Sequence, residues 1–149
     1  MVNTTKKGNK IQRYAKRYFE KLGYTVHMTV RTSQRRGGLW LSQSNDIFNA
    51  FDGIATKLNE KPVFFQTTAI SNMSSKERII DVPLDTNYVD IFIMGYKGGV
   101  PKLDRRTKEK TWLPRHYFKI LGVGLVGGKR RWGLVSPQVD LKQAGVDVE

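Results

Sequence analysis

The chain has 149 residues, of which 26 are Lys or Arg and 13 are Asp or Glu, so its formal net charge is +13. Hydrophobic residues at 39% and aromatic residues at 11% exclude a disordered chain and fit one folded domain. Zero Cys excludes disulfides, thiol catalysis and zinc fingers. A positive surplus of this size predicts a polyanionic partner, and nucleic acid fits it best.

The N-terminal part reads as a basic arm over residues 1–8, a helix over 9–22 and a strand over 24–31. Apolar side chains recur with helical spacing from Ile11 to Leu22, and Gly23 is placed to end the helix. Asn9 and Gln12 have the spacing of a helix capping box. The basic face of this helix could lie along phosphates or could simply be solvated.

Residues 32–44 are rich in Ser, Gln and Gly, and we expect a loop there. The segment combines Arg35 and Arg36 with an isolated Trp40. Arginines mixed with a flat aromatic side chain suit phosphate pairing and base stacking. The alternative is that Trp40 anchors the loop on the core.

Residues 45–68 read as strand, turn and strand, with the turn at residues 59–62. The first strand carries Asp46 and Asp52 within an apolar run. The period of two on the second strand places Gln66 on one face, with Phe64 and Thr68. Burying carboxylates among apolar side chains is costly without a compensating cation or donor. We therefore expect an oxygen-ligand site for a divalent metal in this hairpin.

The C-terminal half predicts a short helix over 71–80, capped by Ser74 or Ser75, and a central strand over 88–94. A charged, Gly- and Pro-containing segment over 97–110 reads as a loop, and two further strands follow at 112–121 and 131–135. Glycines at 122, 124 and 127 match a dinucleotide-binding pattern, but no helix follows them, so we expect a hairpin. His27 and His116 lie far apart and are expected to be structural or surface residues.

Several of these residues occur in the order of the PD-(D/E)xK nucleases, which include restriction enzymes and archaeal-type Holliday junction resolvases. The chain resembles that pattern at Gly8, Gln12-Arg13, Gly23-Tyr24, Arg31, Asp52 and Gln66-Thr67-Thr68. It also resembles phage and viral proteins with a D-x-F-x-x-x-D segment followed by Q-x-T, here Asp46 to Asp52 and then Gln66. The resemblance implies a single α/β domain, an α+β sandwich with a restriction-endonuclease-like core. A mixed central sheet with flanking helices would place the catalytic core in residues 9–80 and further strands and basic loops in 81–149.

The resemblance also implies a site for Mg²⁺ or Mn²⁺ held by Asp52, the side-chain oxygen of Gln66 and the carbonyl of Thr67. The chain departs from the pattern because Gln12, Gln66 and Thr68 replace the helical acid, the Glu and the Lys of the family. Additional negative charge would come from Asp46 or Glu20. The positive charge of the missing lysine would come from Lys76 or Arg78.

The implied function is metal-dependent hydrolysis of DNA, duplex or branched, by a homodimeric endonuclease that cuts at junctions or at specific sites. We expect DNA contacts from twelve residues: Arg13, Arg31, Arg35, Arg36, Trp40, Lys76, Arg78, Arg105, Arg106, Lys129, Arg130 and Arg131. Two alternatives are a nuclease-fold DNA-binding protein without catalysis and a basic RNA-binding protein. No apolar run approaches the roughly 18 residues that span a bilayer, and residues 1–10 are too polar for a signal peptide. A cytoplasmic location, including the cytoplasm of a virus-infected cell, is therefore expected.

Overall fold

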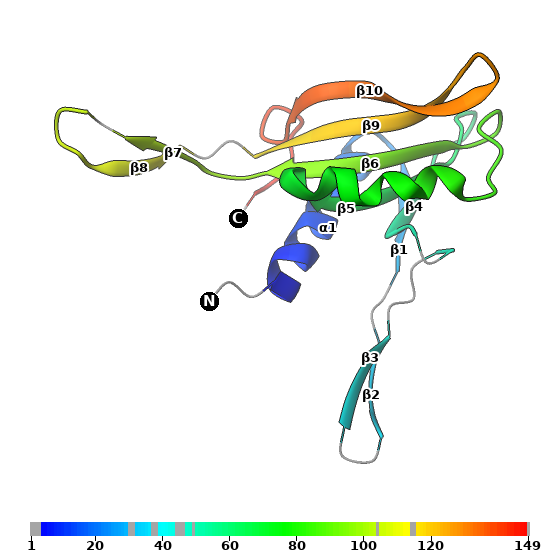
Figure 1. The fold of residues 1–149 in the computed structure, drawn as a ribbon, viewed down its shortest axis with the longest axis horizontal. Helices are drawn as coiled ribbons and strands as arrows, with labels where there is room; N and C mark the ends of the chain where they lie inside the picture. Colours follow the sequence, from blue (N-terminus) through cyan, green and yellow to red (C-terminus); the bar gives the residue numbers. More distant parts are fainter. Residues whose placement is uncertain are drawn as a thin grey trace.

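The computed structural model describes residues 4–29, 32–36, 39–43, 47–48, 50–103, 105–113 and 116–148. A six-stranded sheet forms the body of the molecule, and two hairpins extend from it (Figure 1). The elements in chain order are α1 (Thr4–Lys21), β1 (Thr25–Met28), β2 (Thr32–Arg36), β3 (Leu39–Gln43), β4 (Gly53–Thr56), β5 (Val63–Ala69), the 3₁₀ helix η1 (Ile70–Asp81), β6 (Asp90–Lys97), β7 (Val100–Leu103), β8 (Lys110–Leu113), β9 (Tyr117–Val126) and β10 (Lys129–Asp140).

The strands of the large sheet run in the order β1-β4-β5-β6-β9-β10. All neighbouring pairs are antiparallel except β5 and β6, which are parallel and are joined through η1. A parallel pair needs such a crossover, whereas the antiparallel neighbours are joined by turns or hairpins. The expected α+β fold, with a mixed sheet and flanking helices, is confirmed.

The two faces of the sheet are covered by different elements. One buried cluster joins α1 to Phe65 and Val63 of β5 and to strands β6 and β9. A second cluster lies on the other face, where Ile79 of η1 packs with Phe51 and Ile91 and with the partly buried Phe64. Phe64 and Phe65 therefore point to opposite faces, as the period of two in this strand predicts.

Helix α1 begins five residues earlier than the sequence indicated, at Thr4 instead of Asn9. The capping-box interpretation of Asn9 and Gln12 is therefore wrong, because both residues lie inside the helix. The expected end is confirmed, since Gly23 follows the helix with a φ of 91°. Residues 4–8 of the expected basic arm form the first turn of this helix.

Two segments that we expected to be loops form β-hairpins instead. Strands β2 and β3 pair antiparallel, with Arg35 opposite Trp40, and strands β7 and β8 pair with Pro101 opposite Trp112. Both hairpins project well beyond the six-stranded sheet (Figure 1). Their mostly polar sequences hide the pairing, because neither ribbon has the apolar face that marks a half-buried strand. These two hairpins, residues 32–43 and 100–113, form two arms.

The remaining elements follow the expectations with shifted boundaries. Strand β9 turns into β10 through Gly127 and Gly128, so the glycine-rich segment is a hairpin as expected. Helix η1 is preceded by Ala69 and has no side-chain cap, so the prediction of a Ser cap is wrong. Strand β10 continues to Asp140, well beyond the expected end at Val135. Within the described ranges, no helix has the length and apolar character needed to cross a membrane.

Candidate functional site

Asp52 is a buried carboxylate directly before strand β4, with only 5% of its surface exposed. Its Oδ2 atom accepts two hydrogen bonds from Thr67 of β5, from the backbone N–H at 2.7 Å and from Oγ1 at 2.8 Å. A hydrogen bond to an ionised acceptor is stronger than a neutral one. These two bonds offset part of the cost of burying the charge and fix the carboxylate against the edge of β5.

The backbone around Asp52 connects three strands. Its N–H donates to the carbonyl of Phe65 at 2.9 Å, which continues the β4–β5 pairing. Its carbonyl accepts from Thr29, which follows β1, through the backbone N–H at 2.8 Å and through Oγ1 at 3.1 Å. Thr29 was not among the residues expected at the site. Its partner lies 23 residues away in the chain, so no local pattern could have identified it.

Gln66 and Thr67 are the other buried polar residues of the site, each with 8% of its surface exposed. The side-chain amide of Gln66 donates to the carbonyl of Thr67 at a long distance of 3.4 Å. The alternation along β5 places Gln66 and Thr68 on the face covered by η1, and Thr67 on the face covered by α1. The side chains of Gln66 and Thr67 therefore leave opposite faces of β5, and the Asp52 carboxylate meets the strand at Thr67.

The donor atoms at this place are of the type that hard divalent cations bind. Asp52, the Gln66 amide oxygen and the Thr67 carbonyl supply oxygen ligands, which suit Mg²⁺ and Mn²⁺. Their combined charge is that of one carboxylate. Among the described residues, no group of three or more His, Asp or Glu is placed to hold a metal. Oxygen donors are the type that Mg²⁺ prefers, and a cation held here would have one charged ligand and would need other oxygens to complete its coordination.

Gln12 and Glu20, the two candidate residues of α1, differ in burial. Phe19 packs against Phe65 with ring centroids 4.9 Å apart. Gln12 lies seven residues before Phe19, about 10 Å along the helix and on nearly the same side. Gln12 is partly buried, whereas Glu20 is exposed and lies near the C-terminal end of the helix.

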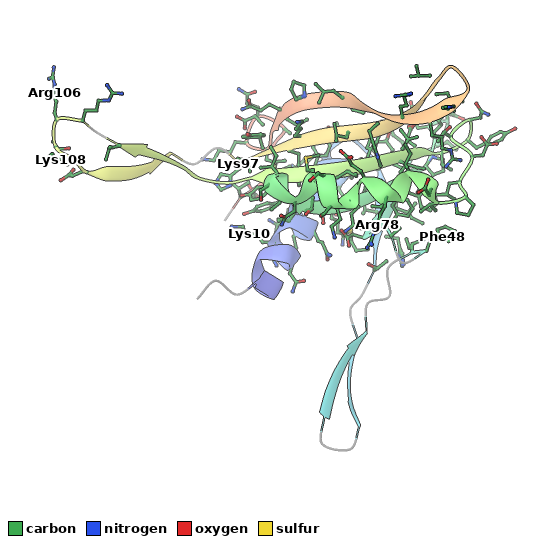
Figure 2. All side chains as sticks on the ribbon, in the orientation of Figure 1. Lys10, Phe48, Arg78, Lys97, Arg106 and Lys108 are labelled. Atoms are coloured by element: carbon green, nitrogen blue, oxygen red, sulfur yellow. The ribbon has the colours of Figure 1, made fainter. Side chains whose placement is uncertain are left out.

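The basic residues expected to contact DNA are spread over several surfaces. Arg13 is exposed on α1, Lys76 and Arg78 lie on η1, and Lys129 and Arg131 are exposed on the β9–β10 hairpin. Figure 2 shows Arg106 and Lys108 at the outer end of the β7–β8 arm, where Arg105 also lies. Arg35, Arg36 and Trp40 belong to the β2–β3 arm. Asp46 and Arg31 lie outside the described residues.

Arg130 has a role that the sequence did not indicate. Its guanidinium donates to three carbonyls, that of Ile80 in the last turn of η1 and those of Val82 and Leu84 just after the helix. The neighbouring Trp132 donates from its indole nitrogen to the carbonyl of Glu77 at 2.8 Å. The two side chains hold η1 to the β9–β10 hairpin, so we leave Arg130 out of the proposed DNA interface.

The two histidines lie in different parts of the sheet. His27 is on β1 opposite Ile54, close to Asp52 in the sheet, and its side chain is exposed. His116 lies beside β6, where its Nδ1 is 2.7 Å from the hydroxyl of Tyr96. Burial raises the pKa of Tyr96 to about 12, and nearby Tyr14 adds to the effect. Burial lowers the pKa of His116, and the positive charges of Lys142 and Lys10 lower it further. This pair packs the N-terminal part of α1 against the sheet, which agrees with the structural role expected for His116.

Comparison of the chain with protein-family models, with curated proteins and with solved structures finds no significant match.

Proposed function

We propose that this protein is a metal-dependent DNA endonuclease whose site is centred on Asp52. The observation that carries the proposal is the meeting of a buried carboxylate, Asp52, with the polar end of β5 at Gln66-Thr67-Thr68. Structural acids are seldom buried beside an amide and two hydroxyls in an otherwise apolar sheet, whereas active sites collect such groups.

The order of the elements supports the same proposal. Apart from the β2–β3 hairpin, helix α1 is followed by strands β1, β4 and β5, helix η1 and strand β6, and only β5 and β6 are parallel. A mixed sheet with flanking helices is what the resemblance to the PD-(D/E)xK nucleases implies. Gln12 lies in the first helix, Asp52 directly before β4 and Gln66 in β5, which matches the sequence order of the pattern.

The charge distribution supports DNA as the substrate. Residues 97–115 contain seven Lys or Arg and two Asp or Glu, and residues 31–43 contain three Arg and no acidic residue. Each segment includes one of the arms, and the described strands of both arms project beyond the six-stranded sheet (Figure 1). A two-stranded ribbon fits the major groove of a duplex, and its basic side chains can pair with phosphates. The arms would thus hold DNA on both sides of the site.

In the proposed reaction, Asp52 and the amide oxygen of Gln66 hold the cation, and Thr67 orients the Asp52 carboxylate through its two donated hydrogen bonds. When bound, Mg²⁺ supplies polarisation of the scissile phosphate and lowers the pKa of a bound water. Lys76 and Arg78 of η1 are the basic side chains on the same face of the sheet as Gln66 and Thr68, and they are assigned to the phosphate.

The test is a cleavage assay with purified protein on linear duplex, branched DNA and single strand, in Mg²⁺, Mn²⁺ or EDTA. The proposal expects cutting in either metal and none in EDTA. A single carboxylate predicts that Mg²⁺ is needed at millimolar concentration or above. Cutting that persists unchanged in EDTA would exclude the proposed mechanism.

A second candidate is a DNA-binding protein with this fold and no catalysis. The observation in its favour is the low charge of the site, because Gln12, Gln66 and Thr68 stand where the family pattern has ionisable groups. The substitution Gln66→Glu distinguishes the two. A catalytic site should bind Mn²⁺ more tightly with the added charge and keep its activity, whereas a site without catalysis should show no cutting in either form.

A further inference from the structure

Phe48 combines two features that are unfavourable in a soluble protein. It has a φ of 54°, in the left-handed region that bulky side chains rarely adopt. Its side chain is also 58% exposed, so the ring does not pack in the core. The other described non-glycine residues with positive φ are Asn59, whose side chain tolerates this conformation, and Lys108 at the tip of an arm.

The turn around Phe48 is held firmly at both ends. Ile47 and Phe51 form an isolated bridge in which each N–H donates to the other's carbonyl at 3.0 Å, and the N–H of Ala50 also donates to Ile47 at 3.0 Å. Phe51 is fully buried, and Ile47 and Ala50 pack against the same cluster. Ile47, Ala50 and Phe51 therefore hold the chain on both sides of Phe48, whose ring does not pack in their cluster.

The position of this ring relates it to the candidate site. Phe48 lies four residues before Asp52, and the turn leads directly into the buried Phe51. Ile79 of η1 belongs to the same cluster as Phe51 and Ile47, which brings the neighbouring Arg78 to this side of the molecule. Figure 2 shows Phe48 and Arg78 along the same lower margin of the body.

An exposed aromatic ring with a basic side chain on the same margin of the body is a combination that binds nucleic acid bases. Bases stack on flat aromatic side chains, and a neighbouring cation pairs with the adjoining phosphate. A base inside a continuous duplex has both faces covered by its neighbours, so such stacking needs a base that is unpaired or displaced. Strain maintained at one residue is typical of functional positions.

We propose that Phe48 is a base-stacking residue that receives an unpaired base of the DNA and thereby positions the adjoining backbone at Asp52. This inference rests on the proposed DNA-cutting function and deepens it. The preferred ligand is duplex DNA interrupted by a gap or a single-stranded overhang. Arg78 is assigned to the phosphate next to the stacked base.

The test compares wild-type protein with Phe48→Asn and Phe48→Trp, using gapped and continuous duplexes of the same sequence. Binding is measured in EDTA, so that catalysis plays no part, and 2-aminopurine in the gap reports stacking through its fluorescence. Phe48→Asn should weaken binding to gapped DNA by about 10-fold or more and abolish the fluorescence change. Phe48→Trp should retain both. Because Asn adopts positive φ more readily, the thermal midpoint of Phe48→Asn should equal or exceed that of wild type.

Three results would overturn the inference. One is equal binding of gapped DNA by wild type and Phe48→Asn. Another is an equal loss of affinity on both DNAs, which would show a contact unrelated to an unpaired base. A third is a lowered thermal midpoint or a changed oligomeric state in Phe48→Asn with unchanged DNA binding, which would make the ring a packing or protein-contact residue. Failure of the wild-type protein to bind any DNA would instead overturn the proposed function together with this inference.

Discussion

Thr67 donates both its backbone N–H and its hydroxyl to one carboxylate oxygen of Asp52, across the junction of β4 and β5. The two residues are 15 positions apart in the chain, and each is buried. The arrangement orients the carboxylate while it also holds the ends of two strands together. Substitutions of Thr67 should therefore affect stability and activity together.

Thr67→Val removes the hydroxyl and keeps the shape of the side chain. The buried carboxylate loses one of two donors, and we expect a decrease of about 2 kcal/mol in the free energy of unfolding, measured by urea denaturation. Thr67→Ser is the matched control, because it keeps the hydroxyl and should restore most of the loss. Equal stability of the Val and wild-type proteins would show that the hydroxyl bond contributes nothing.

Arg130 and Arg131 are adjacent and should behave differently. Arg130→Met removes the donors to the carbonyls at the end of η1 and should lower the free energy of unfolding by about 1–3 kcal/mol. Arg131→Met, at an exposed position, should leave stability nearly unchanged. It should reduce the slope of log binding constant against log salt concentration by about 0.9 if it pairs with one phosphate. The reverse assignment, with Arg130 affecting only DNA binding, would contradict the structure.

His116 should make the protein less stable in mild acid. Because its folded-state pKa is lowered, protonation favours the unfolded chain. Its contribution to the free energy of unfolding is complete above about 6.5, the pKa of histidine in the unfolded chain. That contribution is lost as the pH falls below this value. Thermal midpoints between pH 7.5 and 5 should therefore fall more for wild type than for His116→Asn, which can still accept the Tyr96 hydrogen bond. Parallel curves for the two proteins would refute the prediction.

Gly95 on β6 allows η1 to pack closely on the sheet. A Cβ atom at this position would lie 2.2 Å from the sulfur of Met73 and 3.1 Å from the Cα of Ile70. We expect Gly95→Ala to lower the free energy of unfolding by about 1–3 kcal/mol. Gly124→Ala is the control, since no atom lies within 4 Å of its Cβ position. The packing explanation fails if both substitutions have the same effect.

Local patterns in the sequence were sufficient to predict the helices and strands that bury one face against the core. The alternation in β5 places Phe64 and Phe65 in separate clusters, as predicted, and the apolar stripe of α1 packs against the same sheet. The start of α1 was misplaced because its first turn has no apolar residue to mark it. The arms were missed because the sequences of their strands lack the apolar alternation that marks a half-buried strand.

The candidate site was predictable only in part. Asp52 and Gln66 could be selected because a polar side chain in a core-like strand is unusual at the sequence level. The roles of Thr29 and Arg130 depend on partners that are 23 and 46 to 50 residues away. Such pairings follow from the register of the sheet and the position of η1, which no local pattern encodes.

We propose that Asp52 holds the metal ion with which the protein cleaves DNA. The most direct test of this proposal is the single-turnover cleavage rate of wild type and Asp52→Asn in Mg²⁺, with protein in excess over DNA. Asn keeps the size of the side chain and can still accept from Thr67, so the fold and DNA binding should be retained. We expect cleavage by Asp52→Asn to fall at least 100-fold, because losing a hydrogen-bond partner of a metal ligand already costs about 10- to 100-fold and Asp52 is the proposed ligand itself. Cleavage by this variant at the wild-type rate would contradict it.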